Sequence, residues 1–334
     1  MPNLRLLLLA PLVAFAAACG GTSNDTACAD VATARCTQRS MCTNGTSVTR
    51  LYGDMTTCLA REKLACINGL AAKGTGNSPD HVEQCAAALK AESCADYLAL
   101  VTPAPCISTG TLTDGTACAF SGQCSSTYCT NTANAACGSC GQPVAANGDC
   151  TNGGTCARGQ ACFTTPGTMG TMMSCLTPGA AGASCSRSAP CGSGLSCVGA
   201  TGMGTGGTPG TCMASVSMAG AACDPTLRTA PSCDRTVGLF CNATSKTCTT
   251  ITYAASGGAC GLGSDGNFID CTGGICFGSV TGGPNPMMGA CKADAADGAA
   301  CDTANGPGCI APAKCVTTAG STAGTCTLAD ASKC

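Results

Sequence analysis

Residues 115–140, GTACAFSGQCSSTYCTNTANAACGSC, hold the cysteine pattern that decides the fold. Similar groups of cysteines recur along the chain, and their first members lie 32, 35, 38, 37 and 41 residues apart, at Cys118, Cys150, Cys185, Cys223, Cys260 and Cys301. Repeats of this length are typical of an array of similar modules. We therefore predict six cysteine-rich repeats over residues 108–334, with starts near residues 115, 147, 182, 220, 257 and 298.

Each repeat is expected to contain four cysteines. In the first repeat they are taken as Cys118, Cys124, Cys129 and Cys137, which leaves Cys140 and Cys334 outside the count. Five of the six repeats have glycine three residues before the first cysteine, and Asp114-Gly115 is a tight-turn dipeptide. Such turns open short β-hairpins, so each repeat is predicted to be a small β-hairpin module stabilised by disulfides.

Composition supports a disulfide scaffold. The chain has 35 cysteines in 334 residues and no tryptophan. From Cys19 onward, 14 Leu, 6 Ile, 10 Val and 5 Phe make only 35 of 316 residues. These large apolar side chains are too few to form an ordinary hydrophobic core. We therefore expect disulfide cross-links, made outside the cytoplasm, to stabilise the fold in its place. A net charge of −2 with 10% charged residues excludes a basic surface for nucleic acid.

The N-terminus is predicted to be a secretory signal. Residues 1–18 combine one positive charge with a 13-residue apolar run that is too short to span a bilayer. Small residues precede Cys19, as in a bacterial lipoprotein, so Cys19 is the predicted lipidation site and residues 19–26 a flexible tether. A lipid on Cys19 would leave 34 cysteines for pairing. The alternative is ordinary signal-peptidase cleavage with an unmodified Cys19.

Residues 27–107 are predicted to form a helical, cysteine-containing domain. Asp25 or Thr26, Asp54 and Ser78 are expected to cap its helices. Cys28 and Cys36 are eight residues apart, as are Cys58 and Cys66, which is about 12 Å along a helix and too far for a bridge. Two antiparallel helices would instead pair Cys28 with Cys66 and Cys36 with Cys58.

The spacing Cys118-x5-Cys124-x4-Cys129-x7-Cys137-x2-Cys140, followed by Cys150, Cys156 and Cys162, resembles the N-terminal cysteine-rich domain of the Dickkopf family of secreted proteins. Together with the lipoprotein-like start, the chain is similar to cysteine-rich surface proteins of myxobacteria. The resemblance covers about 45 residues well and implies an extracellular disulfide fold. Only cysteines carry it, so Dickkopf activity is not transferred.

No residue pattern predicts catalysis, a cofactor or a metal. Cys137-x2-Cys140 is the only such pair, whereas a zinc ribbon needs two. His81 is the sole histidine and is expected to be a solvated helix residue. Residues 202–207 match G-x-G-x-x-G but are flanked by cysteines rather than by a strand and a helix. Aspartates in residues 265–302 lack calcium-loop spacing and are expected to form turns.

These patterns favour a non-enzymatic protein of the cell envelope, lipid-anchored to a bacterial membrane, with the outer membrane preferred, or secreted. Its expected role is binding, adhesion or envelope structure, with modules projecting outward and a protein or glycan ligand at their loops. Methionines 169, 172, 173, 203, 287 and 288 are expected to belong to flexible loops of biased composition; the alternatives are contact with a partner and binding of copper. The alternative function is a secreted inhibitor of hydrolases; an extracytoplasmic hydrolase is a third class.

Overall fold

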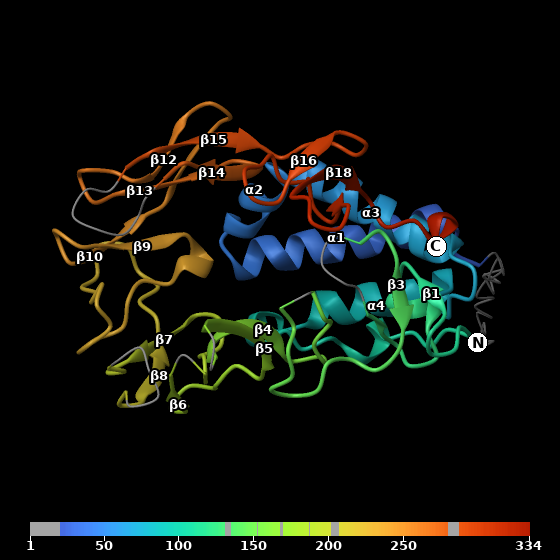
Figure 1. The fold of residues 1–334 in the computed structure, drawn as a ribbon, viewed down its shortest axis with the longest axis horizontal. Coiled ribbons are helices and arrows are strands. Elements are labelled where there is room, and N and C mark those ends of the chain that lie inside the picture. The colour runs from blue at the N-terminus through green and yellow to red at the C-terminus, as the bar shows by residue number, and fades with distance from the viewer. Residues whose placement is uncertain are drawn as a thin grey trace, which may run out of the picture.

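The computed structural model describes residues 21–130, 135–151, 153–167, 170–186, 188–201, 207–279 and 287–334. Helices form the first part of the chain and short strands the rest (Figure 1). The change falls between a 3-10 helix at Ala104–Cys106 and the first strand at Ala117. Within the described residues the α-helices are α1 (Asn24–Cys42), α2 (Thr46–Tyr52), α3 (Met55–Ala71), α4 (Pro79–Ala91) and α5 (Cys94–Leu98).

Local sequence explains where the helices begin. The side chains of Asp54 and Ser78 cap α3 and α4 by accepting hydrogen bonds from free backbone amides, as predicted. For α1 the predicted caps were wrong, because Ser23 accepts the bond from the Thr26 amide. The short helix α2 was not predicted. It begins after Asn44 and Gly45, whose left-handed backbone, with φ of 49° and 77°, ends one helix and turns the chain into the next.

Disulfides hold the helices together. Helix α1 packs against both α3 and α4. Cys28 is joined to Cys66 and Cys36 to Cys58, which are the two cross-helix pairs expected from the eight-residue spacing. The apolar core between the helices is small and consists mainly of alanine, valine and cysteine, with members Ala27, Val31, Ala34, Val82, Cys85 and Ala86. Two further bridges, Cys42–Cys94 and Cys85–Cys106, fix α5 and the 3-10 helix to this core.

Six β modules follow, which we number one to six over residues 112–141, 144–176, 179–214, 216–250, 252–293 and 295–328. Each contains a small sheet, in which the strand pairs are antiparallel except for the parallel pair β11 (Thr252–Ala254) and β13 (Phe268–Cys271) of module five. The strands are β1 (Ala117–Cys118), β2 (Cys129–Thr130) and β3 (Gly138–Cys140) in module one; β4 (Ala161–Gly167) and β5 (Gly170–Leu176) in module two; β6 (Ser184–Cys185), β7 (Leu195–Val198) and β8 (Gly210–Ala214) in module three; β9 (Leu239–Asn242) and β10 (Thr247–Thr250) in module four; β11 (Thr252–Ala254), β12 (Ala259–Leu262), β13 (Phe268–Cys271), β14 (Gly274–Phe277) and β15 (Gly289–Ala293) in module five; β16 (Ala300–Asp302), β17 (Lys314–Thr317) and β18 (Ala323–Thr327) in module six.

Every module has the same disulfide pattern, in which the first cysteine pairs with the third and the second with the fourth. The pairs are Cys118–Cys129 and Cys124–Cys140, Cys150–Cys162 and Cys156–Cys175, Cys185–Cys197 and Cys191–Cys212, Cys223–Cys241 and Cys233–Cys248, Cys260–Cys276 and Cys271–Cys291, and Cys301–Cys315 and Cys309–Cys326.

The fourth cysteine of module one is Cys140, so the assignment of Cys137 to that position was wrong. The reason is strand register: Cys140 lies directly opposite Cys129 across β3 and β2, and the third and fourth cysteines face each other in the same way in every other module. Cys137 pairs instead with Cys334, 197 residues away.

The turn that opens each module is also shared. The residue three places before the first cysteine has left-handed φ in all six modules, from 64° at Asn147 to 84° at Gly115. Its amide donates a 2.8 Å hydrogen bond to the carbonyl of the fourth cysteine in every module. Asparagine tolerates this conformation better than most residues, which explains how module two keeps the turn although its glycine is one place later.

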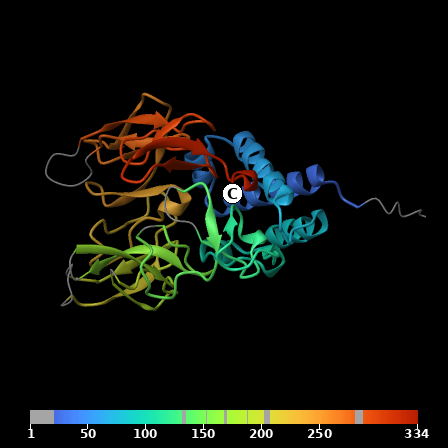
Figure 2. The same ribbon diagram turned by 45° about the vertical axis from the view of Figure 1, so that its right-hand side comes forward.

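The modules do not project outward from the helices, contrary to the expectation. They curve around the helical domain and return to it, so that module six lies beside α3 while module one lies near α4 (Figures 1 and 2). Contacts support this arrangement: the Gly273 amide of module five donates to the Thr49 carbonyl in α2, and Arg61 of α3 bonds Asp297 of module six. The Cys137–Cys334 bridge then closes the array into a ring.

Candidate ligand-binding site

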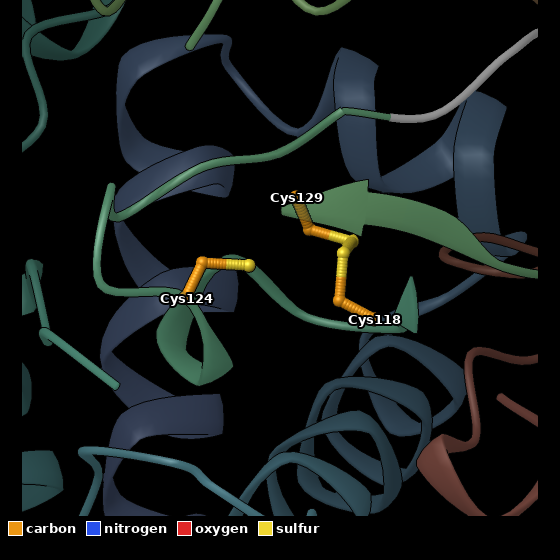
Figure 3. A group of neighbouring side chains, drawn as sticks. All are labelled: Cys118, Cys124 and Cys129. Carbon is orange, nitrogen blue, oxygen red and sulfur yellow. A yellow bond between two sulfur atoms is a disulfide. The ribbon is translucent and has the colours of Figure 1, made fainter. Parts of the chain in front are cut away.

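Clusters of three cysteines occur in the modules and have the proximity of metal ligands, with sulfur atoms within 4.8 Å of one another. Figure 3 shows the one in module one, where Cys118 and Cys129 share a disulfide and Cys124 points toward it. Cys124 is itself bonded to Cys140. Because a metal is bound by thiolates and these sulfurs are oxidised to disulfides, the clusters serve as the covalent cores of the modules.

A cavity of about 340 Å³ lies where the helical domain meets modules one and six. Its volume is within the usual range for small-molecule sites. The helices contribute Val31, Leu70 and Val82 to the wall, module one contributes Phe120, and module six contributes Leu328. No single domain therefore forms the site, because its walls come from three parts of the chain.

Module one is positioned by close backbone contact with the turn between α3 and α4. The Gly76 amide donates to the Gly122 carbonyl at 2.8 Å, and the Gln123 side-chain amide donates to the Lys73 carbonyl at 2.8 Å. Gly76 has no room for a side chain, since a Cβ atom there would lie 2.0 Å from the Thr109 carbonyl oxygen. This approach brings Phe120 against Gly69 at the cavity wall.

Module six is positioned by one arginine of α3. The Arg61 guanidinium donates to both carboxylate oxygens of Asp297, with one bond of 2.8 Å from Nη2 to Oδ1. It also donates to the carbonyls of Ile310, at 3.1 Å, and Ala311, at 3.2 Å. A planar guanidinium suits this combination of a two-pronged carboxylate contact and further acceptors. Pro312, the residue after Ala311, and Lys314, two residues after Pro312, line the cavity.

Glu62 is the acidic group of the cavity and is buried in a network of hydrogen bonds. Its Oε2 accepts from Arg35 at 3.2 Å, and its Oε1 accepts from the Tyr52 hydroxyl at 2.6 Å and lies 3.5 Å from Arg39. Burial opposes ionisation, but Arg35, the Tyr52 hydroxyl and Arg39 outweigh it and hold the pKa of Glu62 below its ordinary value. Burial, together with the Glu62 charge, raises the pKa of Tyr52 to about 12.

Two other polar side chains on the wall differ in their bonding. His81 Nδ1 lies 3.0 Å from Asn77 Oδ1, and the ring is half-buried rather than fully solvated as expected. Lys314 is exposed and forms no ion pair with any residue that the structure describes. Partial loss of water around its ammonium lowers the pKa of Lys314.

The sequence did not single out Glu62, Arg35 or Lys314. For Glu62 a signal was present, because Cys58, Glu62 and Cys66 recur every four residues and therefore share one face of α3. That face carries two of the cross-helix bridges, so a carboxylate on it had to be buried and paired. Lys314 had no comparable signal.

The remaining sequence-predicted features fall into two groups. Cys19, residues 202–206 of the glycine motif, Met169 and Met203 lie outside the described residues. Four of the five aspartates weighed as calcium ligands have other partners: Asp265 accepts from Asn267, Asp270 pairs with Arg50, Asp297 pairs with Arg61 and Asp302 accepts from the amides of Ala304 and Asn305. Asp265 and Asp302 therefore form turns, as predicted, whereas Asp270 and Asp297 form ion pairs. The fifth is Asp294, and burial raises its pKa to about 6.

Met287 and Met288 are exposed, at 60% and 39% of their surface, and Met172 at 42%. Thioethers on an exposed surface are compatible with partner contact, which stays a prediction. Comparison with protein-family models, with curated proteins and with solved structures finds no match to this chain.

Proposed function

We propose that this protein is an extracytoplasmic, non-enzymatic binding protein that takes a small ligand into the cavity between its helices and modules one and six. The cavity itself is the observation on which the proposal depends. It is lined mostly by apolar side chains with a few charged groups, which is the usual composition of a binding site for a small molecule.

Seventeen disulfides place the protein in an oxidising compartment outside the cytoplasm, because cytosolic thiols are kept reduced. Among the described helices, none is both long enough and apolar enough to cross a bilayer. We propose that a lipid on Cys19 holds the protein at a bacterial membrane, preferably the outer membrane. All other 34 cysteines are paired, which leaves Cys19 for modification.

The side chains on the cavity wall support binding rather than catalysis. The hydrogen-bond partner of the His81 ring in the described structure is an asparagine, and both oxygens of Glu62 are engaged by cations and a tyrosine. A general base needs a free lone pair directed at a substrate, and a nucleophile needs such a base beside it. Ligand selection by shape and charge needs neither.

Native mass spectrometry of the oxidised protein tests the proposal. We expect a non-covalent small-molecule adduct at one per chain, or its appearance when a library of small metabolites is added. Ala65→Phe fills the cavity from α3 and should abolish the adduct, whereas Ala60→Phe, on the exposed face of the same helix, should not. An adduct that survives Ala65→Phe, or none under any condition, would overturn the proposal.

Intact mass and membrane extraction test the anchor. A lipidated Cys19 adds the mass of acyl chains to the N-terminal peptide and makes extraction depend on detergent. Cys19→Ser should release the protein into the soluble fraction. A wild-type N-terminal peptide of unmodified mass would overturn the anchor while leaving the binding proposal intact.

A further inference from the structure

The charges on the cavity wall do not balance. Of the lining residues, Arg35 is paired with Glu62, whose other carboxylate oxygen lies 3.5 Å from Arg39, a residue that does not line the cavity. Lys314 adds one further cation to the wall, for which the described chain supplies no carboxylate. Of the cations that line the cavity, Arg35 is turned to Glu62, and Lys314 is the one left free to meet a ligand.

The rest of the wall is apolar and comes from all three sides. It consists of Val31, Leu70 and Val82 on the helices, Phe120 on module one, and Val316 and Leu328 on module six. A hydrocarbon chain placed there would leave water for an apolar surface, which favours binding by about fourfold for each methylene buried. A ligand with only polar groups would gain nothing from these walls.

Size limits the ligand further. At about 30 Å³ of liquid volume per water molecule, a cavity of about 340 Å³ corresponds to roughly eleven waters. A ligand with about that number of non-hydrogen atoms would fill it, and a single ammonium balances one negative charge rather than the two of a phosphate monoester.

From this combination of charge, walls and size we infer that the cavity binds a medium-chain monocarboxylate, with the carboxylate beside Lys314 and the chain against Val31, Leu70 and Phe120. The inference rests on the proposed binding function and names the chemical class of its ligand. Lys314 determines specificity by charge, while the apolar walls provide most of the affinity.

Calorimetric titration of the oxidised full chain with decanoate, below its micelle-forming concentration, tests the inference. Decanol serves as the neutral probe of equal chain length. We expect decanoate to bind about tenfold more tightly than decanol, because a charge-assisted hydrogen bond is lost with the alcohol. Octanoate should bind more weakly than decanoate by about fourfold for each of the two methylenes removed.

The variants separate charge from packing. Lys314→Met should weaken decanoate binding about tenfold and leave decanol unchanged, while Lys314→Arg should keep the preference for decanoate. Lys90→Met removes an exposed lysine on α4 outside the cavity and should change nothing. Unchanged thiol counts and circular dichroism would show that each variant has folded.

Each other outcome is decisive. Equal binding of decanoate and decanol, or an unchanged decanoate affinity in Lys314→Met, overturns the carboxylate assignment and leaves a binding cavity. If neither probe binds but native mass spectrometry finds an adduct sensitive to Ala65→Phe, the ligand class is wrong and the proposed function stands. If no such adduct exists either, both fail.

Discussion

Cys137 and Cys334 share a disulfide that closes a 197-residue loop and ties module one to the segment that follows module six. Ala135 and Ala136, directly before Cys137, line the central cavity, and so do Leu328 and Ala329, shortly before Cys334. The bridge therefore holds together the two parts of the ring that form the outer wall of the site.

Removing this bridge should affect the cavity more than the stability of the whole chain. Cys334 is exposed and Cys137 half-buried, so Cys137→Ala with Cys334→Ala leaves no large void. The bridges inside each module already restrict the unfolded chain, and we expect a loss of about 1–3 kcal/mol in the free energy of unfolding. Hydrogen exchange should rise in residues 135–141 and 328–334. Denaturant unfolding gives the free energy.

The matched comparison is the buried bridge Cys36–Cys58, whose sulfurs are fully inaccessible. Replacing both by alanine removes a cross-link and leaves a cavity in the helical core, for a loss of about 4 kcal/mol or more. If removing the Cys137–Cys334 bridge cost more stability than removing the Cys36–Cys58 bridge, the view that the Cys137–Cys334 bridge acts locally would be wrong.

Glu62→Gln should destabilise the protein near neutral pH and change its response to acid. The variant leaves Arg35 and Arg39 without a buried anion, at a cost of roughly 2–4 kcal/mol. Because the folded pKa of Glu62 is lowered, its contribution is fully present above the unfolded value of about 4.3 and is lost as pH falls through the folded value. Urea unfolding between pH 7 and pH 2 measures both effects.

Asp25→Asn is the control, since Asp25 forms an exposed ion pair with Lys63 at 2.7 Å. Its loss should cost less than about 1 kcal/mol. A Glu62→Gln variant with the same acid dependence as the wild type would show that folding does not lower the pKa of Glu62.

Gly76→Ala should separate module one from the helices. The added Cβ would lie 2.0 Å from the carbonyl oxygen of Thr109, in the segment that leads into module one, so this segment must shift and the neighbouring Gly76–Gly122 hydrogen bond to module one must lengthen, at a cost of roughly 1–3 kcal/mol. Faster exchange of the Gly76 and Thr111 amides, which bond across this contact, is the direct measurement. Gly141→Ala has open space around it and should behave like the wild type, and equal effects at the two sites would refute the docking argument.

Arg61→Lys should loosen module six. A lysine cannot reproduce the two-pronged bond to Asp297 together with the contacts to the carbonyls of Ile310 and Ala311, so we expect a loss of about 1–3 kcal/mol. Thermal unfolding measures the loss of stability, and titration with decanoate measures whether the affinity of the cavity for its ligand falls as well. Arg228→Lys, at an exposed arginine, should change stability by less than about 0.5 kcal/mol.

The sequence predicted those local features that are determined by a single residue or by a fixed spacing between residues. The cross-helix pairs Cys28–Cys66 and Cys36–Cys58 followed from helix geometry alone, because eight residues separate cysteines too far for a bridge within one helix. Module one shows the limit. Cys137 and Cys140 are both close enough in sequence to be the fourth cysteine, and only strand register against Cys129 distinguishes them.

The candidate site could not be predicted in this way. Val31, Phe120 and Leu328 are separated by 89 and 208 residues and become neighbours only because the array curves back onto the helices. Glu62 could have been noticed from its place on the cysteine face of α3. Lys314 could not, because its unpaired state depends on which carboxylates the fold brings near it.

The amino-acid sequence by itself determined that this chain is held together by disulfides, that helices precede a series of similar modules, and where most of these elements begin. Spacing, turn residues and the scarcity of large apolar side chains are local or compositional properties, and they act before any long-range contact forms. Only the tertiary structure decided that the modules surround the helices, that Cys137 reaches Cys334, and that a cavity lies between. These features depend on contacts such as Gly76 with module one and Arg61 with module six, whose partners are chosen in three dimensions.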